Sequence, residues 1–131
     1  MNRRSLCLLL LFLMACGDGS VDDSSDGHSE WRDAVVTLCA AARHAETDRR
    51  AAEDLFMDQA HDPLHEIADA VSQRDRRVAA RLLEAKNLLE LRFEMTKGPS
   101  QDEIEELARR TDIALEVLDI EPVGCVENGD R

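Results

Sequence analysis

The sequence predicts an all-α protein, an up-and-down four-helix bundle that follows a disordered N-terminal tether. Three observations predict this fold class. After about residue 30, apolar residues recur every three or four positions, which is the period of an amphipathic helix. The alternating β-branched and aromatic runs of a strand are missing, and the chain has no tyrosine. Four such segments are joined by short connections, as in an up-and-down bundle.

The first 15 residues read as a secretory signal rather than as part of the fold. Arg3 and Arg4 precede an apolar run over residues 6–15. That run is too short to cross a bilayer core of about 30 Å, but it has the length of a signal-peptide h-region.

The signal ends in Leu13-Met14-Ala15-Cys16, which resembles the lipobox of bacterial lipoproteins. The resemblance covers only the first 16 residues. It implies cleavage before Cys16 and attachment of a diacylglyceryl group to the Cys16 sulfur, and two acyl chains anchor a protein stably. The alternative is a plain secretory signal in which Cys16 has no such role.

The resemblance also implies a location in the cell envelope, outside the cytoplasm. If the cell is Gram-negative, Gly17 favours the outer membrane, because an aspartate after the lipidated cysteine is the usual retention signal of the inner membrane. Residues 16–29 are rich in Gly, Ser and Asp and lack periodicity, so we expect a disordered tether there.

The cysteines predict one disulfide. Cys7 leaves with the signal and Cys16 carries lipid, so Cys39 and Cys125 remain for the folded part. An extracytoplasmic location permits them to pair. The alternative is that Cys39, which lies among alanines, is an ordinary buried thiol.

Residues 30–125 are expected to form the bundle. The first helix is predicted over residues 30–46 with Ser29 as its N-cap. Its inner face is expected to carry Trp31, Ala34, Val35, Leu38, Ala42 and Ala45.

The second helix is predicted to start after Thr47 and Asp48 and to run to about residue 72, interrupted by Pro63. A proline inside a helix removes the hydrogen bond to the carbonyl four residues earlier. The helix therefore either kinks near residues 59–62 or restarts with Asp62 as N-cap and Pro63 in the first helical position.

The third and fourth helices are predicted over residues 74–96 and from Ser100 to about residue 119. The third is expected to be the central helix, because its apolar face is broad. One seam of that face consists of Val78, Leu82, Ala85, Leu89 and Phe93. Three further apolar residues are expected to widen the buried face: Leu88, Leu91 and Met95. Ser100 and Glu103 have the spacing of a capping box. The fourth helix is expected to bury Ile104, Leu107, Ala108, Thr111, Leu115 and Leu118, and residues 126–131 to form a frayed tail.

The charge of the chain argues against nucleic acid as a partner. The formal net charge is -12, with 28 acidic and 16 basic side chains. Binding to nucleic acid is driven by basic surface. One basic group stands out, Arg74, Arg76, Arg77 and Arg81. It reads as a solvated face that balances acidic neighbours, or else as a docking patch for an acidic partner.

One group could carry chemistry, the stretch around Pro63. On a continuous helix Asp58, His61 and His65 fall along one stripe, and Asp62 is adjacent. Histidines four apart with a neighbouring carboxylate can bind Zn or Cu. The simpler interpretation is that both histidines pack and cap the kink, and a catalytic role is the third possibility.

The sequence therefore predicts a non-enzymatic lipoprotein, without an obligatory cofactor, that acts as an interaction or structural module of the envelope. Its partners would be the membrane, through the lipid on Cys16, and another envelope protein. A histidine-based domain for binding or buffering a divalent metal is the alternative. Phosphate-binding loops, nucleophile elbows and paired-cysteine metal motifs are absent from the sequence.

Overall fold

A computed structural model describes residues 24–125 of the chain. Its helices are α1 (Ser24–His44), α2 (Arg49–Leu55), the π-helical segment η1 (Phe56–Ala60), α3 (His61–Ser72), α4 (Arg76–Glu94) and α5 (Gln101–Val117). Since α2, η1 and α3 follow one another without a break, they form a single bent rod. The described part of the chain thus holds four helical rods and no strand.

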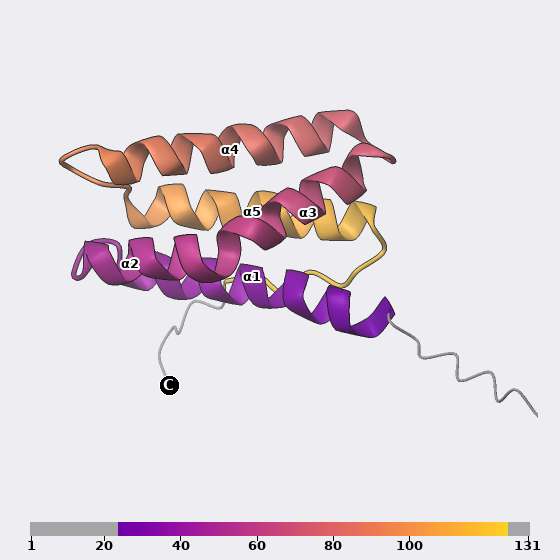
Figure 1. Cartoon of the computed structure of the whole chain (residues 1–131), viewed down its shortest axis with the longest axis horizontal. Helices are drawn as coiled ribbons and strands as arrows, with labels where there is room; N and C mark the ends of the chain where they lie inside the picture. The colour runs from indigo at the N-terminus through magenta and orange to yellow at the C-terminus, as the bar shows by residue number, and fades with distance from the viewer. Residues whose placement is uncertain (1–23, 126–131) are drawn as a thin grey trace, which may run out of the picture.

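The four rods pack as an up-and-down bundle, as predicted (Figure 1). The α2–η1–α3 rod packs against α1, α4 packs against α3 and α5, and α5 returns along α1. α1 and α4 therefore occupy opposite corners of the bundle.

The core is built mainly from the predicted inner faces. Val35 and Leu38 of α1 belong to one buried apolar cluster with fully buried residues of the other rods, among them Phe56, Leu64 and Leu82. In α5 the predicted residues Ile104, Leu107, Ala108, Thr111 and Leu115 are buried, and Leu118 is half-buried. The Thr111 hydroxyl donates to the Leu107 carbonyl oxygen at 2.8 Å, which satisfies this buried polar group.

The predicted start of the first helix is wrong. α1 begins at Ser24 and not after Ser29, so residues 24–29 belong to a helix and not to the tether. The His28 ring packs on Trp31, with ring centroids 5.6 Å apart.

Pro63 is accommodated by a π-helical turn, the first of the two predicted alternatives. The backbone N–H of His61 donates to the Phe56 carbonyl, five residues back, and α3 starts at His61 without a side-chain cap. Asp62 is therefore not an N-cap. Pro63 sits in the first turn of α3, where a missing N–H costs little because the first four N–H groups of a helix have no partner within it.

The helix ends are fixed by caps that the sequence partly foretells. Asp48 accepts from the Ala51 N–H at the start of α2, and Ser100 and Glu103 form the predicted capping box of α5. At the C-terminal end of α4, the Arg49 guanidinium donates to the carbonyl oxygens of Phe93 and Thr96. An arginine from another rod thus satisfies carbonyls that a helix end leaves free.

The role predicted for the third helix is partly wrong. Leu82, Leu89 and Phe93 are buried as expected, and Val78 and Ala85 are half-buried. Leu88, Leu91 and Met95, expected to widen the seam, are instead 51%, 54% and 45% exposed. The reason is geometric: α4 occupies a corner of the bundle and packs on α3 and α5 only, so its outer face has no neighbour.

A disulfide joins Cys39 of α1 to Cys125, as predicted. The segment that leads from α5 to Cys125 is fixed against α5, because the Asp112 carboxylate accepts from the backbone N–H groups of Val123 at 2.8 Å and Gly124 at 2.9 Å. The bridge thereby ties the end of the fourth rod to the middle of the first.

The signal peptide, the lipidation of Cys16, the tether up to residue 23 and the tail 126–131 lie outside the described residues. Within residues 24–125, no helix has both the length and the apolar character needed to cross a bilayer.

Candidate functional site

A polar cluster lies where η1 passes into α3 and faces α4. The two ring nitrogens of His61 each approach a carboxylate: Nε2 lies 2.7 Å from Glu90 Oε1, and Nδ1 lies 2.9 Å from Asp62 Oδ1. Lys86 Nζ donates to the same Glu90 oxygen at 2.7 Å. The π turn brings His61 to this position, and such turns are frequent at functional sites.

Lys86 is the unusual member of this cluster, because it is only 2% exposed. A buried ammonium is costly unless it is paired, and Glu90 supplies the counter-charge. Burial by itself would raise the pKa of Glu90, but the hydrogen bonds and positive charge of Lys86, with the hydrogen bond of His61, outweigh it and hold that pKa below its usual range. Glu90 is therefore the carboxylate that joins α4 to the π turn.

Among the predicted metal ligands, His61 lies beside His65 and beside Asp62. The rings of His61 and His65 are 5.0 Å apart, and Asp62 contacts His61. Asp58 is exposed in η1 and makes no side-chain contact with either histidine among the recorded hydrogen bonds and ion pairs of residues 24–125. Across this range no three His, Cys, Asp or Glu side chains converge as a metal site requires.

Lys86 and Glu90 were missed by the sequence reasoning. The buried residues of α4 follow a strict alternation of three and four: Ala79, Leu82, Lys86, Leu89 and Phe93. Position 86 falls on that stripe, and Glu90 follows it by one turn, which is the spacing of a helical ion pair. The signal was therefore present, but a lysine on an apolar stripe is easily assigned to solvent.

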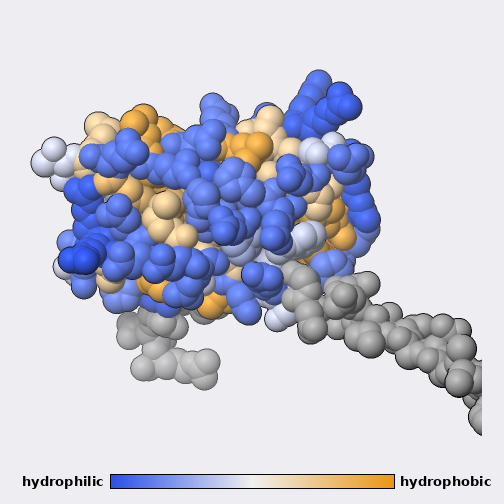
Figure 2. All heavy atoms as spheres, viewed as in Figure 1, coloured by the Kyte–Doolittle hydropathy of each residue, from blue (hydrophilic) through white to orange (hydrophobic). Residues whose placement is uncertain are grey.

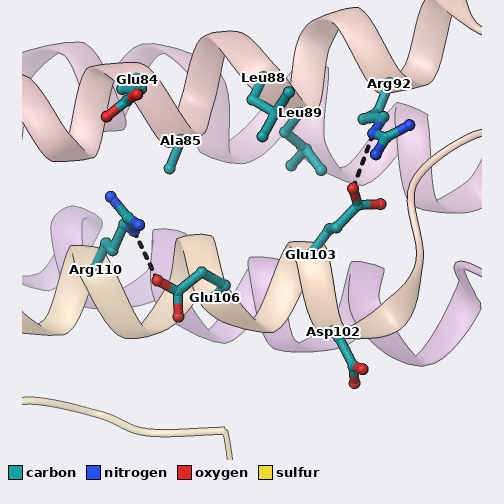
Figure 3. Close-up of a pocket in the computed structure, with 9 residues that line it drawn as sticks. All are labelled: Glu84, Ala85, Leu88, Leu89, Arg92, Asp102, Glu103, Glu106 and Arg110. Carbon is teal, nitrogen blue, oxygen red and sulfur yellow. Dashed lines mark hydrogen bonds and ion pairs between the residues drawn. The ribbon is translucent and has the colours of Figure 1, made fainter.

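A second feature is a groove between α4 and α5, formed by two hollows that share Arg110. Figure 3 shows the larger hollow. The larger hollow has a volume of about 290 Å³ and the smaller about 170 Å³. We call this the α4–α5 groove. It is lined by Val78, Arg81, Glu84, Ala85, Leu88, Leu89, Arg92, Asp102, Glu103, Glu106, Arg109, Arg110 and Ile113.

Apolar side chains form the floor of the groove, and ion pairs cross or border it. In Figure 3, Leu88 and Leu89 point from α4 toward α5, whereas Asp102 points away from the hollow. Arg92 Nε lies 2.8 Å from Glu103 Oε1 and forms an ion pair with it. At the middle of the groove Arg110 Nε donates to Glu106 at 2.8 Å.

These arginines change the acidity of their partners. The hydrogen bonds of Arg109 and Arg110 lower the pKa of Glu106 to about 2. The backbone N–H of Ser100 is the main cause that lowers the pKa of Glu103, and Arg92 adds to it. Both carboxylates therefore stay charged over the whole neutral range and hold the guanidinium groups in place.

Apolar surface extends outward from the groove along α4. Leu88, Leu91 and Met95 are three and four residues apart, so they form one stripe on a single helix face. Figure 2 shows hydrophobic surface among charged residues over α4. Exposed apolar area of this kind, rimmed by polar groups, is typical of an interaction site.

Comparisons of the chain with protein-family models, with curated proteins and with solved structures find no match. Functional reasoning here therefore rests on the residues themselves.

Proposed function

We propose that this chain is a lipoprotein of the bacterial envelope, anchored outside the cytoplasm through lipid on Cys16, whose helical bundle serves as an interaction or structural module. The observation that carries the proposal is Leu13-Met14-Ala15-Cys16 at the end of a basic and apolar leader. The Cys39–Cys125 disulfide supports it, because such bonds persist in oxidising compartments and are rare in the cytosol.

The outer membrane is the favoured location in a Gram-negative cell, because Gly17 follows the lipidated cysteine. The expected partners are the membrane, through the lipid, and another protein of the envelope. The α4–α5 groove and the exposed stripe on α4 favour an interaction module over an enzyme, since they offer apolar area rather than a set of convergent catalytic groups.

Membrane fractionation tests the anchor. Changing Cys16→Ala should move the protein out of the membrane fraction and abolish its labelling with a fatty-acid probe. The control is Cys39→Ser, which keeps Cys16 and should remain labelled and membrane-bound. Labelling that persists in Cys16→Ala would remove the proposal.

Binding of a divalent metal, Zn or Cu, is the second candidate function. The 5.0 Å separation of the His61 and His65 rings favours it. Against it, both His61 nitrogens lie against carboxylate oxygens, so a metal would have to displace Asp62 or Glu90 from the ring. The rival interpretation is that His61 ties the π turn to α4.

Thermal unfolding with added metal separates the two interpretations. Zn or Cu at a hundred times its Kd should raise the free energy of unfolding by about 2.7 kcal/mol. The gain should disappear in His61→Ala and His65→Ala, while His44→Ala serves as the control. An unmoved melting curve with Zn, Cu, Ni and Co would leave the histidines with a structural role.

A further inference from the structure

The α4–α5 groove differs in charge from the protein as a whole. The formal net charge of the chain is -12. At the end of the groove where α4 begins, three arginines meet the apolar side chains of Val78 and Ile113. They are Arg81, Arg109 and Arg110, and the nearby carboxylates that line the groove, Glu84 and Glu106, leave this end positive.

Part of this positive charge is available to a ligand. Arg109 and Arg110 share Glu106 as their partner, and the Arg109 side chain is still 61% exposed. Arg81 is exposed, and its side chain makes no ion pair or hydrogen bond recorded within residues 24–125. In contrast, the Arg92 charge at the opposite end is matched by Glu103.

The length, charge and exposed apolar area of the groove fit a helix of another protein better than they fit a second copy of this chain. From residue 78 to residue 92, α4 extends for about 21 Å, so a helical segment of roughly 14 residues would cover it. A second copy would bring the same excess of negative charge. The three half-exposed side chains of the α4 stripe also supply only a small part of the roughly 800 Å² that each partner of a stable dimer buries.

We propose that the α4–α5 groove binds an amphipathic helix of another protein, with its apolar face on Leu88 and acidic residues over Arg81 and Arg109. Amphipathic helices bind grooves of this kind through anchors at helical spacing. Charge complementarity at one end would set the direction in which the helix lies and exclude basic partners. This inference rests on the proposed role as an interaction module and names the chemistry of its partner.

Site-specific photo-crosslinking in the native host tests the groove. Benzoylphenylalanine replaces Leu88 in the full-length chain, and Val36 is the matched control position. Both side chains are 51% exposed, and Val36 lies on α1 at the opposite corner. Leu88 should crosslink to a polypeptide whose crosslinked segment, sequenced by mass spectrometry, has apolar residues at helical spacing and a net negative charge.

Other crosslinking results would overturn the inference. These are a basic segment, a second copy of this chain, a lipid adduct, or a yield at Leu88 no greater than at Val36. The charge is tested by adding Arg81→Glu to the Leu88 crosslinking variant, which should lower the yield about tenfold. Arg50→Glu makes the same change of charge on exposed α2 and should leave the yield unaltered. An unchanged yield in Arg81→Glu would rule out an acidic partner.

Failure of this inference can be told apart from failure of the lipoprotein proposal. A protein that is membrane-bound through Cys16 and crosslinks from Val36 alone keeps its role as an envelope interaction module but loses this groove. A protein that crosslinks from Leu88 to an acidic helix while Cys16→Ala leaves its fractionation unchanged keeps the groove and loses the anchor.

Discussion

Lys86 shows how a single charged residue can occupy a position that the packing reserves for an apolar one. It lies on the buried stripe of α4 between Leu82 and Leu89 and is 2% exposed. Its ammonium is held by Glu90, which also contacts His61 on the π turn. The Lys86–Glu90 pair lies within α4, and Glu90 connects it to the second rod through His61. Polar groups in a core can fix register at some expense of stability.

The two members of this pair should respond unequally to substitution. Lys86→Met keeps the volume and removes the buried charge, so it should change the free energy of unfolding by less than about 1 kcal/mol or increase it. Glu90→Ala leaves the buried ammonium without its counter-charge and should lower the free energy of unfolding by about 2 to 3 kcal/mol. Urea denaturation measures both. Equal losses in the two variants would contradict this account of the cluster.

Glu106 should make stability depend on pH on the acid side. Arg109 and Arg110 lower its pKa from 4.5 to about 2 in the folded state. The ionised carboxylate therefore stabilises the fold above about pH 4.5, and this contribution is lost as the pH falls toward 2. Its size is reduced by solvent, because the Glu106 side chain is 39% exposed.

Unfolding at a series of pH values measures this contribution. Glu106→Gln should be less stable than the parent at pH 7, and the difference should shrink between pH 4.5 and pH 2. The control is Glu116→Gln, which removes an exposed carboxylate in the last turn of the same helix. A difference that stays constant down to pH 2 would show that the arginines do not stabilise the ionised Glu106.

At the scale of elements, the π turn decides the register of the second rod. The turn holds one more residue than the α-helical spacing would, and it lets Phe56 and Leu64 both be fully buried. It also aims His61 at Glu90 on α4. If the same residues followed an α-helical path, the one extra residue would rotate the two halves of the rod against each other by about 100°.

Deletion of Asp58 tests this role, because the residue is exposed and lies in the middle of the turn. The deletion removes the extra residue, so it should convert the turn to α-helix, keep Phe56 and Leu64 on one buried face, and change the free energy of unfolding by less than about 1 kcal/mol. Asp58→Ala keeps the residue count and should be neutral within about 0.5 kcal/mol. A deletion variant that loses about 3 to 5 kcal/mol, the cost of moving a large apolar side chain out of the core, would contradict this account of the turn.

Local signals predicted those elements whose cause is local. The capping box at Ser100 and Glu103 is a matter of adjacent residues, and it marks the start of α5 correctly. The interruption at Pro63 was predicted from the missing N–H, but the π-helical turn places Phe56 against Phe93 and His61 against Glu90, and both of these partners lie on another rod. The start of α1 at Ser24 was missed because polar residues without periodicity give no sign of a helix.

The candidate sites were harder to predict because they depend on which faces meet. Periodicity marks Leu88 and Leu91 as apolar, but only the corner position of α4 shows that they face outward. Asp62, a neighbour in the chain, contacts His61, whereas Asp58 contacts neither histidine among the recorded side-chain interactions of residues 24–125, and Glu90 comes from another rod, 29 residues away. The pairing of Cys39 with Cys125 was predicted by elimination, on the expectation that Cys7 leaves with a signal peptide and Cys16 carries lipid.

For the whole molecule, the disulfide is the cross-link that joins its two ends. It links α1 to the segment after α5 and closes a loop with a sequence separation of 86 residues. In the chain-entropy account, closing a loop of this length contributes about 4 to 5 kcal/mol by restricting the unfolded state. A domain of this size has only about 5 to 15 kcal/mol of net stability, so the bridge would supply a large share.

Removal of the bridge should therefore lower the Tm sharply without changing the fold. A loss of this size corresponds to roughly 20 °C, since each kcal/mol shifts the Tm of a small domain by about 4 to 8 °C. Thermal unfolding followed by circular dichroism, with and without dithiothreitol, measures the shift. Cys39→Ser with Cys125→Ser should behave like the reduced parent and should no longer respond to the reductant.

Protein exported through an oxidising compartment should also be lighter by two hydrogens before reduction than after it. Two titratable thiols in that native protein, or an equal Tm in both states, would contradict a stabilising bridge between α1 and the end of the chain.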